Sequence, residues 1–244
     1  MSRLRTPWPR WAAQFGIFAS IQFGVLTVLA MLLYAGGNNA EPTRPGYAFF
    51  ANFFSDLGLT VAYSGRANTF SMILFATALT LAGLGLIIFF VAWPRWIANR
   101  LPAQLIAYLG SFFGIGAGLS YIGVAFTPAN LLREAHINFV YAAFVSFFLG
   151  VLCYLVAILL TPGYRRGYAA VLGVFALLLA GYIWLLFNGP NTNTVQGLTI
   201  QVTGQKVIAY ASITTLFIVA LGANRMIVPA TSPPAGEPLA SPAD

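Results

Sequence analysis

The sequence predicts an all-α, polytopic integral membrane protein, a six-helix transmembrane bundle with a partly structured outer loop between helices 1 and 2. Hydrophobic residues make up 59% of the 244 residues and charged residues only 7%, whereas about a quarter of the residues in a soluble domain are charged. The apolar residues also stand in blocks of about 20 or more, the length that crosses a bilayer as a helix. Because the blocks do not alternate polar and apolar residues, they lack the pattern of a transmembrane β-barrel.

Six apolar blocks follow one another along the chain. They cover about residues 12–35, 70–92, 104–126, 137–160, 168–187 and 207–227. The first block is longer than the core of a signal peptide, so we expect it to remain in the protein as a span. Residues 12–227 are therefore predicted to form one membrane domain, between a short N-terminal segment (1–11) and a Pro-rich tail (228–244) whose composition predicts disorder.

The Arg and Lys residues predict the orientation, because the cytoplasmic connections of membrane proteins carry an excess of them. Eight fall on the side of the two termini: Arg3, Arg5, Arg10, Arg95, Arg100, Arg165, Arg166 and Arg225. Four fall on the other side: Arg44, Arg66, Arg133 and Lys206. This predicts a multi-pass protein of the plasma or inner membrane, with both termini cytoplasmic and residues 36–69 outside. The scattered basic residues, despite a net charge of +7, argue against a nucleic-acid partner.

The tetrapeptide WPRW occurs at residues 8–11 and again at residues 93–96, on the same predicted side. Trp and Arg are typical of the headgroup level of a membrane. We therefore expect both copies to be interfacial anchors, with a remnant of an internal duplication as the alternative.

Gly110, Gly114 and Gly118 form a GxxxGxxxG ridge on one face of the third block. Small residues at this spacing let a second helix approach closely inside lipid, so the ridge predicts a helix-packing surface. The sequence leaves open whether the partner is another span of the chain, a second copy of the protein or a different membrane protein.

The connections on the predicted outward side hold few ionisable residues, and these are unusual in kind and position. Asp56 stands in the loop sequence NFFSDLG, and His136 and Lys206 stand near the predicted starts of the fourth and sixth spans. Because ionisable groups at such depth are usually paired or face a wet cavity, we predict an outward-facing ligand pocket. Its predicted residues are Ser55, Asp56, Arg66, Arg133, His136 and Lys206.

Each of these residues also has a simpler interpretation. The basic side chains can extend to the lipid headgroups, Glu134 can be a solvated surface charge, and Asp56 can cap a turn of the loop. His136 can complete a helix end. Thr127 and Pro128 have the residue types of an N-cap and a first helical position, which predicts that the fourth helix starts there.

No motif of a catalytic, metal or cofactor site accompanies these residues. One His and one Cys in the whole chain cannot supply a three- or four-ligand zinc site or bis-His haem ligation. Ser55 or Ser120 could be combined with His136 and Asp56 into a Ser-His-Asp set, but the nucleophile-elbow motif is missing. We therefore predict no metal and no cofactor, and assign no catalytic residue.

The outward SDLG motif, the His at the fourth span and the basic residue at the sixth resemble a bacterial membrane family, domain of unknown function 998. The pattern is more distantly similar to the eukaryotic Frag1/DRAM/Sfk1 group, six-span proteins with an ISD-x-G motif in the first outer loop. The resemblance is carried by Ser55, Asp56, Gly58, His136 and, more loosely, Lys206. It implies a lipid-related role, because the eukaryotic group is associated with lipid remodelling and lipid-kinase regulation.

Three classes of function agree with these observations. The leading hypothesis is the binding or handling of a membrane lipid or another amphiphile, since few polar groups lie on one side and are framed by aromatic residues. The first alternative is a non-catalytic accessory subunit, which would use the Gly ridge or the lipid-facing flanks. The second is a membrane-embedded hydrolase or small transporter, and a hydrolase would require Asp56 and His136 within hydrogen-bond reach.

Overall fold

The computed structural model describes residues 8–97 and 100–226, which contain six long helices and no strand. The helices are α1 (Trp8–Leu32), α2 (Thr69–Ala92), α3 (Leu101–Ala125), α4 (Arg133–Leu159), α5 (Arg166–Asn188) and α6 (Val195–Met226). Each is long and apolar enough to cross a membrane, which confirms the predicted fold class. The predicted disorder of residues 228–244 lies outside the described residues.

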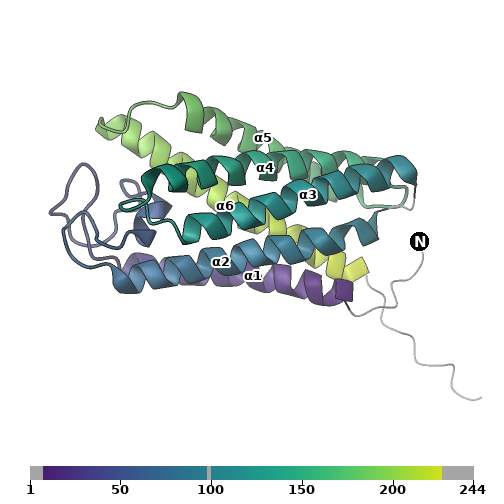
Figure 1. Ribbon diagram of the computed structural model, residues 1–244. Helices are drawn as coiled ribbons and strands as arrows, with labels where there is room; N and C mark the ends of the chain where they lie inside the picture. The colour runs from purple at the N-terminus through teal and green to yellow at the C-terminus, as the bar shows by residue number, and fades with distance from the viewer. Residues whose placement is uncertain (1–7, 98–99, 227–244) are drawn as a thin grey trace, which may run out of the picture.

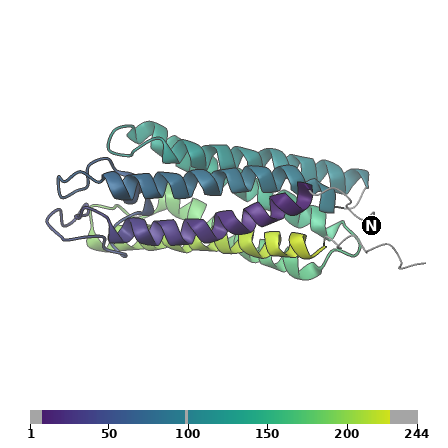
Figure 2. The ribbon, with the colours of Figure 1, turned by 90° about the horizontal axis from the view of Figure 1, so that it is seen from below.

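The six helices form a closed ring in chain order. Each helix packs against the next one along the chain, and α6 returns to pack against α1. Figure 1 shows the long axes of the helices running in the same general direction, and Figure 2 shows α1 (purple) beside α6 (yellow). The first and last helices therefore complete the ring.

The bundle has two distinct ends. The loop end consists of residues 33–68, 126–132 and 189–194, and it contains the short 3₁₀ helix η1 (Phe54–Gly58). The terminal end consists of residues 93–97 and 160–165 with the start of α1 and the end of α6, and it contains the 3₁₀ helix η2 (Trp93–Trp96). The loops of residues 33–68 gather beyond the helices at the left of Figure 1.

The outer surfaces of the helices are apolar. Phe70, Phe112 and Leu177 are 75%, 70% and 75% exposed, although each lies on a helix that can span the membrane. Such exposed side chains are unfavourable in water but normal on a surface that faces lipid.

Helix α6 begins at Val195, well before the predicted start near residue 207. Residues 195–206 are rich in Thr, Gln and Gly, so their composition predicted a loop. The helix starts here because Thr194 provides a cap, its Oγ1 accepting a hydrogen bond from the backbone N–H of Gly197 at 3.1 Å. Lys206 consequently lies well inside α6 and not at its start.

The prediction that both WPRW copies are interfacial anchors is wrong for the second copy. Trp8 and Trp11 at the start of α1 are exposed, but Trp93 and Trp96 are only 2% and 5% exposed. Because η2 packs back onto α2 and α3, its indoles enter the core, where the Trp93 ring stacks on Tyr154 with centroids 3.9 Å apart.

The Gly ridge of α3 faces two neighbouring helices of the same chain. A Cβ added to Gly110 would lie 2.8 Å from the ring of Tyr154 in α4, and one added to Gly118 would lie 2.6 Å from the carbonyl oxygen of Gly83 in α2. Gly114 is covered by the ring of Phe90 in α2. The ridge thus lets α3 pack closely between α2 and α4, so a second protein is not needed to cover it.

We predict that Gly114→Ala lowers the free energy of unfolding in detergent micelles by about 1–3 kcal/mol, the usual effect of overpacking a core. The added Cβ would lie 2.2 Å from Cγ of Phe90, and Phe90 is 1% exposed and cannot move aside. Gly173→Ala in α5 is the matched control, because its Cβ would meet nothing within 4 Å. Equal stability of the two variants would contradict the close packing of the ridge.

Candidate functional site

Asp56 lies in η1, and its side chain is buried, with the residue 5% exposed. Its Oδ2 accepts two hydrogen bonds of 2.9 Å, from Nδ2 of Asn52 and from the backbone N–H of Phe53. Phe53 directly precedes η1, so Asp56 caps the start of this helix. The simpler of the two interpretations of Asp56 therefore describes its local role.

Burial makes the charged form of Asp56 unfavourable and raises the pKa of this carboxyl to about 6. The hydrogen bonds from Asn52 and Phe53 lower the pKa, as does the positive charge of Lys206, but they do not offset the burial. In the folded protein Asp56 is therefore mostly protonated below about pH 6 and mostly ionised above it.

Asn52 connects Asp56 to the rest of the loop and to α6. Its Nδ2 donates to Oδ2 of Asp56 and to the carbonyl oxygen of Gly37, both at 2.9 Å, and its Oδ1 accepts from the backbone N–H of Ala48 at 2.9 Å. Its backbone carbonyl oxygen accepts a hydrogen bond from Nζ of Lys206. Since the side chain is fully buried and all its polar atoms are used, Asn52 is the centre of this arrangement.

The Lys206 ammonium is buried among aromatic rings. Its Nζ lies 5.4 Å from the ring centroid of Tyr47, 5.1 Å from that of Phe49 and 5.6 Å from that of Phe54. Aromatic faces attract a cation, and more strongly when both are withdrawn from water. The rings and the carbonyl of Asn52 together stabilise a charge that would otherwise be costly at this position.

Asp56 and Lys206 are linked through Asn52 and not by direct contact. Among the described residues, the one ion pair within 4 Å joins Arg44 and Glu41 at the surface. We call Tyr47, Asn52, Asp56 and Lys206 the Asn52 cluster; it joins the loop between α1 and α2 to α6.

The structure does not bring the other predicted residues into this cluster. The side chains of Arg66, Arg133 and Glu134 are exposed at the loop end. His136 is buried, but its Nδ1 is hydrogen-bonded to the carbonyl oxygen of Thr127 at 2.6 Å. His136 thus ties the start of α4 to the preceding loop, whereas the hydrogen bonds of Asp56 are to Asn52 and Phe53.

The prediction that Thr127 and Pro128 start the fourth helix is wrong. Helix α4 begins at Arg133, and residues 127–132 form turns. Thr127 instead belongs to the end of α3, because its Oγ1 donates to the carbonyl oxygen of Gly123 at 2.8 Å. A Thr side chain can satisfy a free carbonyl at the end of a helix as well as a free N–H at the start, so residue type alone did not distinguish the two.

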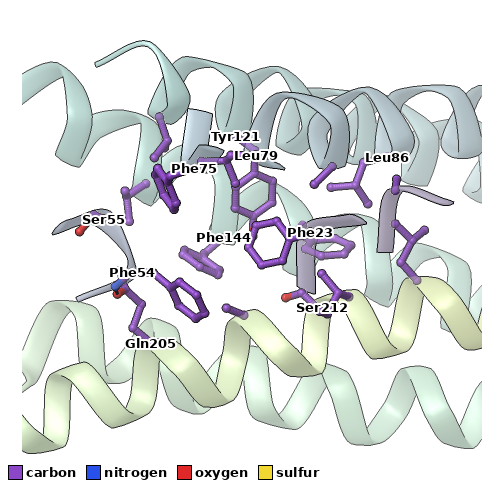
Figure 3. Close-up of a pocket in the computed structure, with 18 residues that line it drawn as sticks. Phe23, Phe54, Ser55, Phe75, Leu79, Leu86, Tyr121, Phe144, Gln205 and Ser212 are labelled. Carbon is purple, nitrogen blue, oxygen red and sulfur yellow. Dashed lines mark hydrogen bonds between the residues drawn. The ribbon is translucent and has the colours of Figure 1, made fainter. Parts of the chain in front are cut away.

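A cavity lies inside the ring of helices, next to η1 (Figure 3). Helices α1, α2, α3, α4 and α6 and the 3₁₀ helix η1 line it, and α5 does not. The walls are mostly aromatic and aliphatic, with side chains such as Phe23, Phe75, Leu79 and Phe144. The centre of a water molecule can range over about 90 Å³ of this space, well above the 10–15 Å³ or so that a single water requires.

Four polar side chains interrupt this apolar lining. Ser55 comes from η1, Tyr121 from α3, and Gln205 and Ser212 from α6, and Figure 3 labels all four around the cavity. Of the predicted ligand-binding residues, only Ser55 is among those that line the cavity.

Phe54 separates the cavity from the Asn52 cluster. Its side chain lines the cavity and also lies over the ammonium of Lys206. Its backbone N–H donates to Oε1 of Gln205 at 2.7 Å. Gln205 and Lys206 of α6 therefore hold η1 in place over one end of the cavity.

Gly58 lets η1 lie directly on α2. A Cβ at this position would lie 2.8 Å from the ring of Phe75, which lines the cavity. Beyond Gly58, the buried Asn68 fixes the end of the loop, with Nδ2 donating to the carbonyl oxygens of Leu57 and Leu59 at 3.1 and 3.0 Å. The loop is thus held at both ends of η1.

Sequence reasoning missed Asn52, Asn68 and Gln205. A role for Asn52 could have been predicted, because it is a polar residue within the same aromatic-rich run that contains Asp56. Such residues are buried only when they are hydrogen-bonded. Gln205 lies in the polar stretch that was predicted to be a loop, so its contact with η1 could not be inferred.

Comparisons with protein-family models, with curated proteins and with solved structures found no match. The resemblance of the SDLG motif to domain of unknown function 998 therefore remains a prediction, and any functional argument depends on the geometry described above.

Proposed function

We propose that this protein binds the apolar part of a lipid or of another amphiphile in the cavity enclosed by its helices. The observation that supports this most directly is the cavity itself, which has aromatic and aliphatic walls with a few polar groups. Cavities with apolar walls bind apolar ligands, and few polar groups among apolar walls are typical of small-molecule sites.

The polar groups lie where an amphiphile would need them. Ser55 and Gln205 stand at the end of the cavity covered by η1, while side chains such as Leu86 line it farther along α2. A head group placed beside Ser55 and Gln205 would leave its chain among the aromatic and aliphatic walls. In the orientation predicted from the Arg and Lys counts, this end faces the outside of the cell.

Asp56 and Lys206 act on this site indirectly in our proposal. Both are buried in the Asn52 cluster, which positions Phe54 and Ser55 at the cavity. The cluster therefore holds η1 at the loop end of the cavity. The accessory role could use the Gly ridge or the lipid-facing flanks, and the ridge gives it no support because it is covered by α2 and α4.

Filling the cavity tests the proposal. Ala209 in α6 lines the cavity, so Ala209→Phe is expected to reduce the amount of lipid that co-purifies, measured by native mass spectrometry, by about tenfold or more. A clash of about 1–3 kcal/mol with a bound chain has an effect of this size. Ala170→Phe in α5, at an exposed position outside the lining, is the matched control and should retain its lipid.

Both variants must unfold at temperatures close to that of the wild type for the comparison to be valid. Equal lipid content in Ala209→Phe and in the wild type would contradict binding in the cavity. Stable co-purification of a protein partner in the absence of any lipid would favour the accessory role instead.

A further inference from the structure

The terminal end of the bundle is strongly basic. Six described Arg side chains lie there, all exposed: Arg10, Arg95, Arg100, Arg165, Arg166 and Arg225. The acidic residues within the described ranges are Glu41, Asp56 and Glu134, and all three belong to the loop end or to the first turn of α4 beside it. Nothing acidic in the described part of the terminal end therefore neutralises these Arg residues.

Two of the Arg residues lie at a groove between α5 and α6. The groove is lined by Arg165, Arg166, Gly167, Tyr168, Val171 and Ile218. The Arg166 guanidinium is oriented by a hydrogen bond of 2.7 Å from its Nη1 to the carbonyl oxygen of Leu159, the last residue of α4. Since Arg carries five N–H donors, this bond leaves donors of Arg166 for a ligand.

The groove changes from basic to apolar along the helices. Arg165 and Arg166 stand at the start of α5, and Val171 follows about 8 Å farther along the helix axis, at 1.5 Å per residue. Ile218 lies in α6 two turns before the end of that helix. A molecule in the groove would therefore meet two guanidinium groups at the level of the lipid headgroups and apolar side chains at the level of the acyl chains.

The ring of Tyr168 lines the groove and is held in place by α6. A Cβ added to Gly222 in α6 would lie 2.3 Å from the hydroxyl oxygen of Tyr168, so the ring is packed against the backbone of α6. At Gly167, in contrast, an added Cβ would meet nothing within 4 Å, so the space beside the two Arg residues is open.

We propose that this groove is a binding site for an anionic phospholipid, separate from the central cavity. The planar guanidinium groups of Arg165 and Arg166 match the geometry of a phosphate group, and an acyl chain would follow Val171 and Ile218. Basic pockets between transmembrane helices bind anionic lipid headgroups in this manner. The positive charge of this end, which no acidic group among its described residues offsets, favours an anionic lipid over a zwitterionic one.

The test is a titration of the purified full-length protein with phosphatidylglycerol and, separately, with phosphatidylcholine of the same acyl chains, followed by native mass spectrometry. We expect the double variant R165Q/R166Q to bind phosphatidylglycerol about tenfold more weakly than the wild type. The control R95Q/R100Q removes the same charge from the same end but outside the groove, and it should bind within about twofold of the wild type. Phosphatidylcholine binding should be little affected in both.

A second variant tests the apolar half of the groove without changing the charge. Val171→Trp fills the groove and should also weaken phosphatidylglycerol binding, whereas Ala209→Phe, which fills the central cavity, should not. Equal losses in R165Q/R166Q and R95Q/R100Q would overturn the proposal in favour of a general effect of surface charge. Unchanged binding in R165Q/R166Q would overturn it outright.

Discussion

Asn52→Ala is expected to lower the free energy of unfolding by several kcal/mol, the largest stability loss that we predict for a single substitution in this protein. The change removes the side-chain partners of Gly37, Ala48 and Asp56 at once. A buried polar group that loses its hydrogen bond costs about 1–3 kcal/mol. Because Asn52 is fully buried, water cannot take the place of the missing amide without opening the loop.

Asn130→Ala is the matched control for this prediction. Asn130 also joins two segments of the loop end, since its Nδ2 donates to Oγ1 of Thr60 at 2.7 Å and its Oδ1 accepts from the backbone N–H of Thr60 at 3.2 Å. Its side chain is exposed, however, so water can replace these bonds and the loss should be within about 0.5 kcal/mol. Equilibrium unfolding in detergent micelles measures both variants, and similar small losses would show that the Asn52 cluster does not hold the loop.

The stability of the wild type is expected to fall by about 2 kcal/mol between pH 4 and pH 6 because of Asp56 alone. The pKa of this carboxyl is raised from 3.8 to about 6 in the folded protein. The folded state therefore binds a proton across this window that the unfolded state has already released, and stability decreases as the pH rises. The contribution of Asp56 becomes constant only above about pH 7, and the full shift of about two pKa units corresponds to about 3 kcal/mol.

Asp56→Asn removes this dependence, because an amide does not ionise but can still accept the hydrogen bonds from Asn52 and Phe53. The difference between the unfolding free energies of wild type and variant should thus change by about 2 kcal/mol from pH 4 to pH 6. Glu134→Gln, a change at an exposed carboxylate, should retain the slope of the wild type. A pH-independent difference between wild type and Asp56→Asn would show that the carboxyl is not buried as described.

Hydropathy was sufficient to predict the six helices, because the length and composition of a membrane span are set by the thickness of the bilayer. Hydropathy did not predict the correct boundary where a helix extends beyond its apolar residues. Residues 195–206 are polar for a span, yet they continue α6 because the loop between α1 and α2 packs against them through Gln205 and Lys206. The composition of one segment cannot reveal a partner that is about 150 residues away in the sequence.

The candidate site was predicted only in part, because its contacts also join segments that are distant in the sequence. The sequence marked Asp56 and Lys206 correctly as unusual charges, and the structure brings them together through Asn52. It could not distinguish them from Arg66 and Arg133, which are exposed, because the position of a residue in the sequence does not specify which way its side chain points. The cavity itself has no signature in the sequence, since its walls are ordinary apolar residues of five helices.

The contacts that hold η1 also determine how late in synthesis the site can form. Phe54 and Gln205 are 151 positions apart and Asn52 and Lys206 are 154 apart, so α6 must be synthesised as far as these residues before either pair can form. Until α6 is inserted, the nascent chain lacks one wall of the cavity and the cation nearest to Asp56. The cavity therefore acquires its α6 wall, and η1 its two anchors on α6, in the same event of synthesis.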